Sequence, residues 1–154
     1  MRHEFIQRSR IPAPAEAVFA WHEAPDAFAR LNPPWEKVTI LEQTGPVSEA
    51  GSRVTIEITL FGPIRQRWVS VHQNYIAGRQ FQDVQVSGPF QFWEHTHSVI
   101  PQEDGSCVLQ DRIVYELPLS PLSDWVAGWH VRGKLARMFE YRHQVVFKQF
   151  AAGV

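Results

Sequence analysis

The sequence contains a single cysteine, Cys107, among 154 residues. One cysteine cannot form an intramolecular disulfide or a cluster of thiolate ligands, and such scarcity is typical of proteins from a reducing compartment. Cys107 lies in a strand with an apolar pattern, which favours a place in the core over a role as a nucleophile. We therefore expect the chemistry of the protein to depend on other side chains.

The sequence also lacks long apolar runs and an excess of charge. No segment approaches the roughly 18 apolar residues of a membrane span, and the first residues, MRHEFIQRSR, lack the apolar segment of a signal peptide. The 15 Lys and Arg residues balance 16 Asp and Glu residues, so no net field attracts nucleic acid or an anionic membrane. We expect a cytoplasmic protein that binds no nucleic acid and has no membrane span.

Aromatic residues, in contrast, are abundant, with six Trp and ten Phe. Bulky aromatic side chains fill cores and also line sites for apolar ligands, so composition alone leaves both roles open. The length fits one domain, and a domain of this size buries about 68–70% of the surface that its unfolded chain exposes. We expect residues 1–154 to form a single domain with one sizeable core.

The spacing of apolar residues predicts an α+β domain. Residues 3–11 are expected to form a strand, and two short helices follow at about 14–23 and 25–31. From residue 37 the apolar pattern has a period of two, which predicts six consecutive strands joined by short turns. The segment at about 122–150 has apolar residues at helical spacing, which predicts one long amphipathic C-terminal helix. The predicted turns contain Gly45-Pro46, Gly62-Pro63, Ala77-Gly78, Gly88-Pro89 and Asp104-Gly105.

A curved meander of this kind needs cover on its concave face, and only the C-terminal helix is long enough to provide it. The segments IPAPAEAVFAWH, FQDVQVSGPFQFWEHTHSV, LQDRIVYELP and MFEYRHQ resemble the helix-grip (SRPBCC) superfamily. This superfamily includes START lipid-transfer domains, polyketide cyclase/dehydrases and plant pathogenesis-related proteins. The segments are most similar to its bacterial ligand-binding branch, whose members are sometimes fused to a nucleotide-sugar-epimerase-like domain.

The resemblance covers the whole chain and implies a helix-grip fold, in which a curved seven-stranded antiparallel sheet surrounds a long C-terminal helix. It also implies a cavity between sheet and helix. It does not imply one reaction, because the superfamily hosts binding proteins, transporters, hydrolases and cyclases. The resemblance points to no metal-binding family, so we expect no cofactor. The resemblance leaves two kinds of protein partner open, a second copy of the chain in a homodimer and an epimerase-like protein.

The stretch FWEHTHSVIPQEDGSCVLQD, residues 92–111, carries polar groups within a predicted hairpin. Side chains alternate across a strand, so Trp93, His95 and His97 share one face. A two-residue turn would mix polar and apolar side chains on both faces, whereas a three-residue turn at 103–105 separates them. We therefore prefer the three-residue turn. It pairs His97 with Asp111, His95 with Ile113 and Trp93 with Tyr115.

Three interpretations of His95, His97 and Asp111 compete. Two imidazoles at i and i+2 lie about 6.5 Å apart along a strand and could share a metal ion with the carboxylate. Alternatively, the carboxylate could orient an imidazole for acid/base chemistry. We favour a third interpretation, a polar network that is structural or orients a ligand, because buried polar groups in an apolar pocket need hydrogen-bond partners.

Other candidates depend on which face of each element points inward. Trp68 and His72 share a strand face that the resemblance favours as internal, although their register is undetermined. Asp83 is either a cavity residue or a solvated strand residue. Phe139 and Arg142 lie three apart on the final helix, so Arg142 either reaches a cavity carboxylate or a ligand anion, or lies on the surface.

The leading hypothesis is the binding of a small apolar or aromatic molecule in a pocket of roughly 300–1,000 Å³. One alternative is a cyclase, dehydratase or hydrolase that uses the His95, His97 and Asp111 trio for proton transfer. The other is an interaction domain that serves a partner enzyme, if Trp125 or Trp129 faces outward. No residue is assigned a catalytic or metal role. The predicted ligand-binding residues are Trp68, His72, Asp83, Trp93, His95, His97, Asp111, Tyr115, Phe139 and Arg142.

Overall fold

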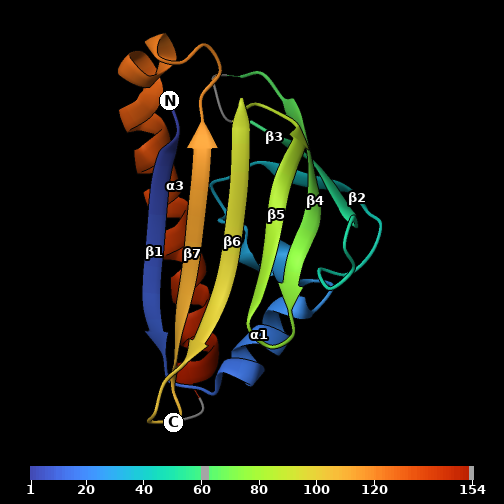
Figure 1. Cartoon of the computed structure of the whole chain (residues 1–154), viewed down its shortest axis with the longest axis vertical. Coiled ribbons are helices and arrows are strands. Elements are labelled where there is room, and N and C mark those ends of the chain that lie inside the picture. The colour runs from blue at the N-terminus through green and yellow to red at the C-terminus, as the bar shows by residue number, and fades with distance from the viewer. Residues whose placement is uncertain (60–62, 153–154) are drawn as a thin grey trace.

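The structure is a computed structural model that describes residues 1–59 and 63–152, so Gly62 of the predicted Gly62-Pro63 turn lies outside the described residues. Within these ranges, seven strands and three helices follow one another (Figure 1). In chain order they are β1 (His3–Ile11), α1 (Ala15–Glu23), α2 (Ala27–Leu31), β2 (Val38–Gln43), β3 (Arg53–Ile58), β4 (Gln66–Ile76), β5 (Gln80–Ser87), β6 (Phe92–Pro101), β7 (Cys107–Glu116) and α3 (Leu122–Ala151).

The strands form one antiparallel sheet in the order β1-β7-β6-β5-β4-β3-β2. Strands β2 to β7 are a meander, and β1 pairs with β7 at its far edge. The predicted α+β helix-grip fold, with a curved seven-stranded antiparallel sheet, two short helices and a long C-terminal helix, is confirmed. The second helix begins at Ala27, two residues later than predicted. Ala24 is extended, as expected for a residue before a proline, so the chain turns before α2 begins.

The β6–β7 hairpin has the predicted register, in which His97 opposes Asp111. The backbone N–H of Gln102 donates to the carbonyl of Ser106 over 2.9 Å, which leaves three residues in the turn. Gly105 has a φ of +83°, the left-handed conformation that this turn requires and that glycine adopts without a steric penalty. The turn therefore fixes which side chains of β6 and β7 face inward.

The long helix α3 lies behind β1 and β7 in Figure 1 and covers the inner face of the sheet. Its buried side chains are spaced three or four residues apart, so they form one stripe along the helix. These residues are Val131, Leu135, Phe139, His143 and Val146. The first turns of α3 carry two tryptophans with largely exposed side chains, Trp125 at 85% and Trp129 at 76%. No helix in the described residues is long and apolar enough to cross a membrane.

Candidate functional site: a histidine and aspartate cluster in an apolar cavity

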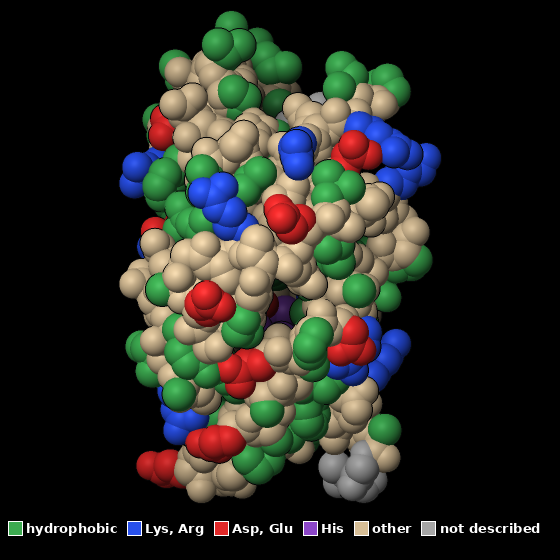
Figure 2. All heavy atoms as spheres, turned by 90° about the vertical axis from the view of Figure 1, so that its right-hand side faces the viewer, with side chains coloured by type: hydrophobic (Ala, Val, Ile, Leu, Met, Phe, Trp, Pro, Cys, Tyr) green, Lys and Arg blue, Asp and Glu red, His purple; other side chains and the backbone are tan. Residues whose placement is uncertain are grey.

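A cavity of about 540 Å³ lies between the inner face of the sheet, α3 and the α1–α2 segment. Much of its wall is aromatic or aliphatic and includes Trp68 and Trp93 from the sheet, Phe90 from the segment between β5 and β6, and Leu135 and Phe139 from α3. Figure 2 looks onto the right-hand side of Figure 1 and shows a recess with histidine atoms at its bottom. The cavity is therefore an apolar space with a polar region in its wall.

Asp111 is the centre of the polar region. Its Oδ1 accepts hydrogen bonds from His95 Nε2 at 2.7 Å and from His97 Nδ1 at 2.9 Å. Its Oδ2 accepts a third hydrogen bond from His143 Nε2 at 2.7 Å. Burial favours the neutral acid, but the surrounding histidines, His97 first, outweigh it and hold the Asp111 pKa well below its usual range. One buried carboxylate thus joins three histidines from β6 and α3.

His95 lies between two carboxylates, because its Nδ1 is 2.8 Å from Oδ1 of Asp83 and its Nε2 is 2.7 Å from Oδ1 of Asp111. An ionised carboxylate only accepts hydrogen bonds, so both ring nitrogens must carry protons. Burial opposes the charge, but Asp83 and Asp111 outweigh it and raise the pKa of His95 to about 10. Burial also opposes ionisation of Asp83, but the neighbouring His95 outweighs this effect and lowers the pKa of Asp83. His95 is therefore a fixed imidazolium ion at neutral pH.

His97 and His143 use their remaining ring nitrogens differently. Nδ1 of His143 pairs with the hydroxyl of Ser9 over 2.8 Å, so both of its ring nitrogens have partners. Nε2 of His97 is buried and has no hydrogen-bond partner in the described residues. The His97 ring stacks on Phe81, with ring centroids 4.7 Å apart. His97 is thus the member of the cluster with an uncommitted nitrogen.

Arg142 and His72 border the same cavity. The Arg142 guanidinium lies over the ring of Phe139, 4.9 Å from its centroid, and its Nε has no hydrogen-bond partner in the part of the chain that the structure describes. Burial lowers the pKa of Arg142, against the opposing effect of nearby carboxylates including Asp111 and Asp83. Burial likewise lowers the pKa of His72, which opposes Asp83 across β4 and β5.

The structure brings most of the predicted site residues together. Tyr115 is the exception, because it is buried in the core against Phe90 and does not line the cavity. Trp68 and His72, whose orientation the sequence left open, point inward and are 8% and 7% exposed. The predicted residues that line the cavity are Trp68, His72, Asp83, Trp93, His95, His97, Asp111, Phe139 and Arg142.

Two histidines that lie beside His97 and Asp111 were missed by the sequence analysis. His143 follows Phe139 by four residues on the buried stripe of α3, so helical periodicity contained a signal for it. His22 similarly follows Val18 by four residues on the buried side of α1. Its ring centroid lies 4.3 Å from that of His97. Periodicity places both residues inside the protein but does not say that they reach one cavity.

The donor atoms of His95, His97 and Asp111 lie within 4.8 Å of one another, which is close enough for three ligands of one metal ion. Both histidines already donate to Asp111, however, through protons on His95 Nε2 and His97 Nδ1. A metal bound through these two nitrogens would have to displace both protons, because only a deprotonated imidazole nitrogen can be a ligand. The geometry is therefore that of a closed hydrogen-bond network.

A curved sheet that encloses an internal cavity against a long helix defines a helix-grip protein. The chain belongs to the family described as "Polyketide cyclase / dehydrase and lipid transport", which it matches over residues 2–144. No curated protein sequence matches the chain.

Solved structures show the same fold. A START superfamily protein from Mycobacterium smegmatis is 18% identical, with a TM-score of 0.71 and 99% of each chain covered. A norcoclaurine synthase point mutant from Thalictrum flavum, in complex with a transition-state analogue, is 14% identical, with a TM-score of 0.69 and coverage of 97% of this chain and 96% of that one. A nucleoside-diphosphate sugar epimerase from Corynebacterium glutamicum is 26% identical, with a TM-score of 0.66, and the match covers 94% of this chain but 28% of the epimerase.

Proposed function

We propose that the protein binds a small apolar or aromatic molecule, with one or two polar groups, in the cavity between the sheet and α3. The observation that carries this proposal is a cavity of about 540 Å³ with a largely apolar wall and a polar cluster on one side. Ligand pockets in proteins usually have this composition, and their volumes are about 300–1,000 Å³. The description of the family also names lipid transport, a function that requires an apolar ligand site.

The charges of the wall favour a neutral ligand. Asp83 and Asp111 are held in the ionised form beside the cationic His95 and Arg142, so the acidic side chains of the wall already have cationic neighbours. Glu36, which also lines the cavity, is paired with Lys134, whose Nζ lies 3.3 Å from Glu36 Oε2. An ionic ligand would add an unbalanced charge to a partly dehydrated space, which is costly.

The test is binding of N-phenyl-1-naphthylamine, a neutral aromatic probe whose fluorescence increases in apolar surroundings. We expect saturable binding that Val131→Trp weakens at least about tenfold, because Val131 is 5% exposed and lines the cavity. Val126→Trp is the matched control on the same helix, since Val126 is 61% exposed and lies outside the cavity. Equal binding by both variants, or no saturable binding by the wild type, would reject the proposal.

A proton-transfer enzyme of cyclase, dehydratase or hydrolase type is the second candidate. It is supported by the His97–Asp111 hydrogen bond and by the uncommitted Nε2 of His97. In this candidate His95 cannot be the base, because both of its nitrogens already carry protons. His97→Gln should then abolish turnover of a bound substrate while it leaves the dissociation constant nearly unchanged, and unchanged turnover would remove the candidate.

A protein partner is a further proposal, and it is supported by the exposed Trp125 and Trp129 on α3. The partner would be a second copy of this chain or an epimerase-like enzyme. Size-exclusion chromatography with light scattering tests the first case, and co-purification with such an enzyme tests the second. Trp125→Gln combined with Trp129→Gln should disrupt either complex.

We also propose that His95 and His97 hold no metal. Stoichiometric zinc, iron or nickel in an elemental analysis of the purified protein would contradict this proposal.

A further inference from the structure

His22 presents a neutral hydrogen-bond acceptor to the cavity. It lies on α1, is 6% exposed, and its Nδ1 is 2.7 Å from the backbone carbonyl oxygen of Val18. A carbonyl oxygen has no proton to give, so Nδ1 must carry the hydrogen of this bond. Burial first, and then the neighbouring His97, lower the pKa of His22 to about 3. The second nitrogen, Nε2, therefore has a free lone pair at neutral pH.

The Nε2 atom of His22 has no protein partner within residues 1–59 and 63–152, yet the side chain is part of the cavity wall. Asp111 in the same cavity wall is different in this respect, because both of its oxygens already accept hydrogen bonds from histidines. His22 is thus an acceptor that the fold leaves available for a ligand.

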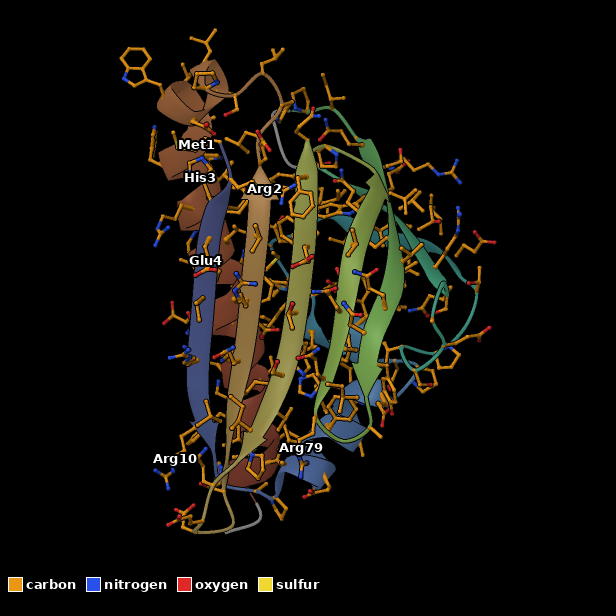
Figure 3. The ribbon with its side chains drawn as sticks, viewed as in Figure 1. Met1, Arg2, His3, Glu4, Arg10 and Arg79 are labelled. Carbon is orange, nitrogen blue, oxygen red and sulfur yellow. The ribbon has the colours of Figure 1, made fainter. Side chains whose placement is uncertain are left out.

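The helix that carries His22 is held in place against the β4–β5 hairpin. The hydroxyl of Tyr75 donates to Glu23 Oε1 over 2.6 Å, and Arg79 donates to Glu16 Oε1 over 2.9 Å. Figure 3 shows Arg79 near the lower end of the sheet, beside α1. The contacts lie on either side of His22 in the sequence, and they hold the helix segment that carries it.

We propose that His22 Nε2 accepts a hydrogen bond from a hydroxyl group of the ligand, so that the cavity selects neutral aromatic alcohols and phenols over their ethers and parent hydrocarbons. The inference rests on the proposed binding function and adds the chemical class of the ligand. An ether of the same skeleton fills similar space but has no hydrogen to donate. Binding it leaves Nε2 dehydrated and unpaired.

The experiment compares 2-naphthol with 2-methoxynaphthalene, naphthalene and 2-naphthoate at pH 7 by displacement of N-phenyl-1-naphthylamine. For the wild type we expect 2-naphthol to bind about five- to tenfold more tightly than 2-methoxynaphthalene, the value of one hydrogen bond. The anion 2-naphthoate should bind more weakly than 2-naphthol. His22→Phe should abolish the preference for the hydroxyl group, measured as the ratio of the dissociation constants of 2-methoxynaphthalene and 2-naphthol. His3→Phe is a matched control outside the cavity and should keep the preference.

The outcomes separate this inference from the proposed function. If the probe and all four naphthalenes fail to bind, the binding function itself is wrong. If they bind but the wild type does not prefer 2-naphthol, or His22→Phe keeps the preference, only the role of His22 is wrong. Tighter binding of 2-naphthoate would overturn the selection of a neutral ligand.

A second measurement needs no variant, which matters if His22→Phe does not fold. Imidazole ¹⁵N resonances distinguish a nitrogen that carries hydrogen from one with a free lone pair. In the wild type, His22 Nε2 should have the resonance of an unprotonated nitrogen. It should move toward the protonated range when 2-naphthol is added and not when 2-methoxynaphthalene is added. A protonated Nε2 in the free protein, or equal responses to both compounds, would refute the inference.

Discussion

Removal of the Asp111 carboxylate tests whether the histidine cluster is a connected network. Asp111→Ala leaves three buried histidines without a shared acceptor, and it leaves the His95 imidazolium with only Asp83 as counterion. Breaking a buried charge pair by removing one partner costs about 3–5 kcal/mol. We expect Asp111→Ala to lower the free energy of unfolding by about that amount.

Asp111→Asn should cost less, about 1–3 kcal/mol. The amide oxygen can accept from His95 and His97, but the amide nitrogen must then donate toward His143 Nε2. His143 can adapt by moving its proton to Nδ1 and donating it to the hydroxyl of Ser9, which lies 2.8 Å away. The remaining cost is the loss of one negative charge beside His95.

Arg112→Ala is the control for these variants. Arg112 is the neighbour of Asp111 in β7 but points to the opposite face, where it donates to Glu4 Oε2 over 2.8 Å. Figure 3 shows Glu4 on the outer strand β1. Both side chains are more than 40% exposed, so the loss should stay within about 0.5 kcal/mol.

The assay is urea denaturation of the four proteins, with midpoints compared at equal m-values. The predicted order of stability is wild type, Arg112→Ala, Asp111→Asn and Asp111→Ala, from highest to lowest. A midpoint for Asp111→Ala equal to or above that of Arg112→Ala would show that Asp111 does not hold the cluster together.

Two further predictions follow from the ionisation of buried groups. The pKa of His95 is raised to about 10 and that of His22 is lowered to about 3, from a usual 6.5. The stability from His95 is complete below pH 6.5 and is lost as the pH rises toward 10, whereas His22 costs stability as the pH falls from 6.5 toward 3. The free energy of unfolding should therefore be highest near pH 6.5, and His22→Phe should flatten the acidic side of the profile; a profile unchanged by that variant would contradict this reasoning. Burial raises the pKa of the Cys107 thiol to about 11, so a disulfide reagent should react with it only at the rate of unfolding, and rapid reaction in native conditions would contradict its buried position.

The sequence alone determined the fold and the register of the hairpin that carries the site. Side chains alternate between the two faces of β6 and β7, and a glycine marks the turn between them. An odd number of turn residues was therefore needed to bring all the apolar positions to one face, and this parity argument paired His97 with Asp111. Parity also placed Tyr115 on the inner face. It could not say how far along the strand the cavity extends, and that depth is set by the side chains of α3 that pack over Tyr115 and its neighbours.

Only the tertiary structure decided which other residues join the cluster. Asp83 meets His95 because β5 pairs with β6 in a register that places these two residues opposite each other, and the sequence between the two strands does not reveal that register. His22 lies on α1, which precedes strands β2 to β7 in the sequence, and His143 lies on α3, which follows them. Their rings reach His97 and Asp111 only after both helices have packed against the sheet. Helical periodicity gives the buried face of a helix, but its rotation and height against a sheet depend on the packing of all the side chains between them. The protonation states of the cluster depend on these distances, and so does the ligand chemistry that follows from them.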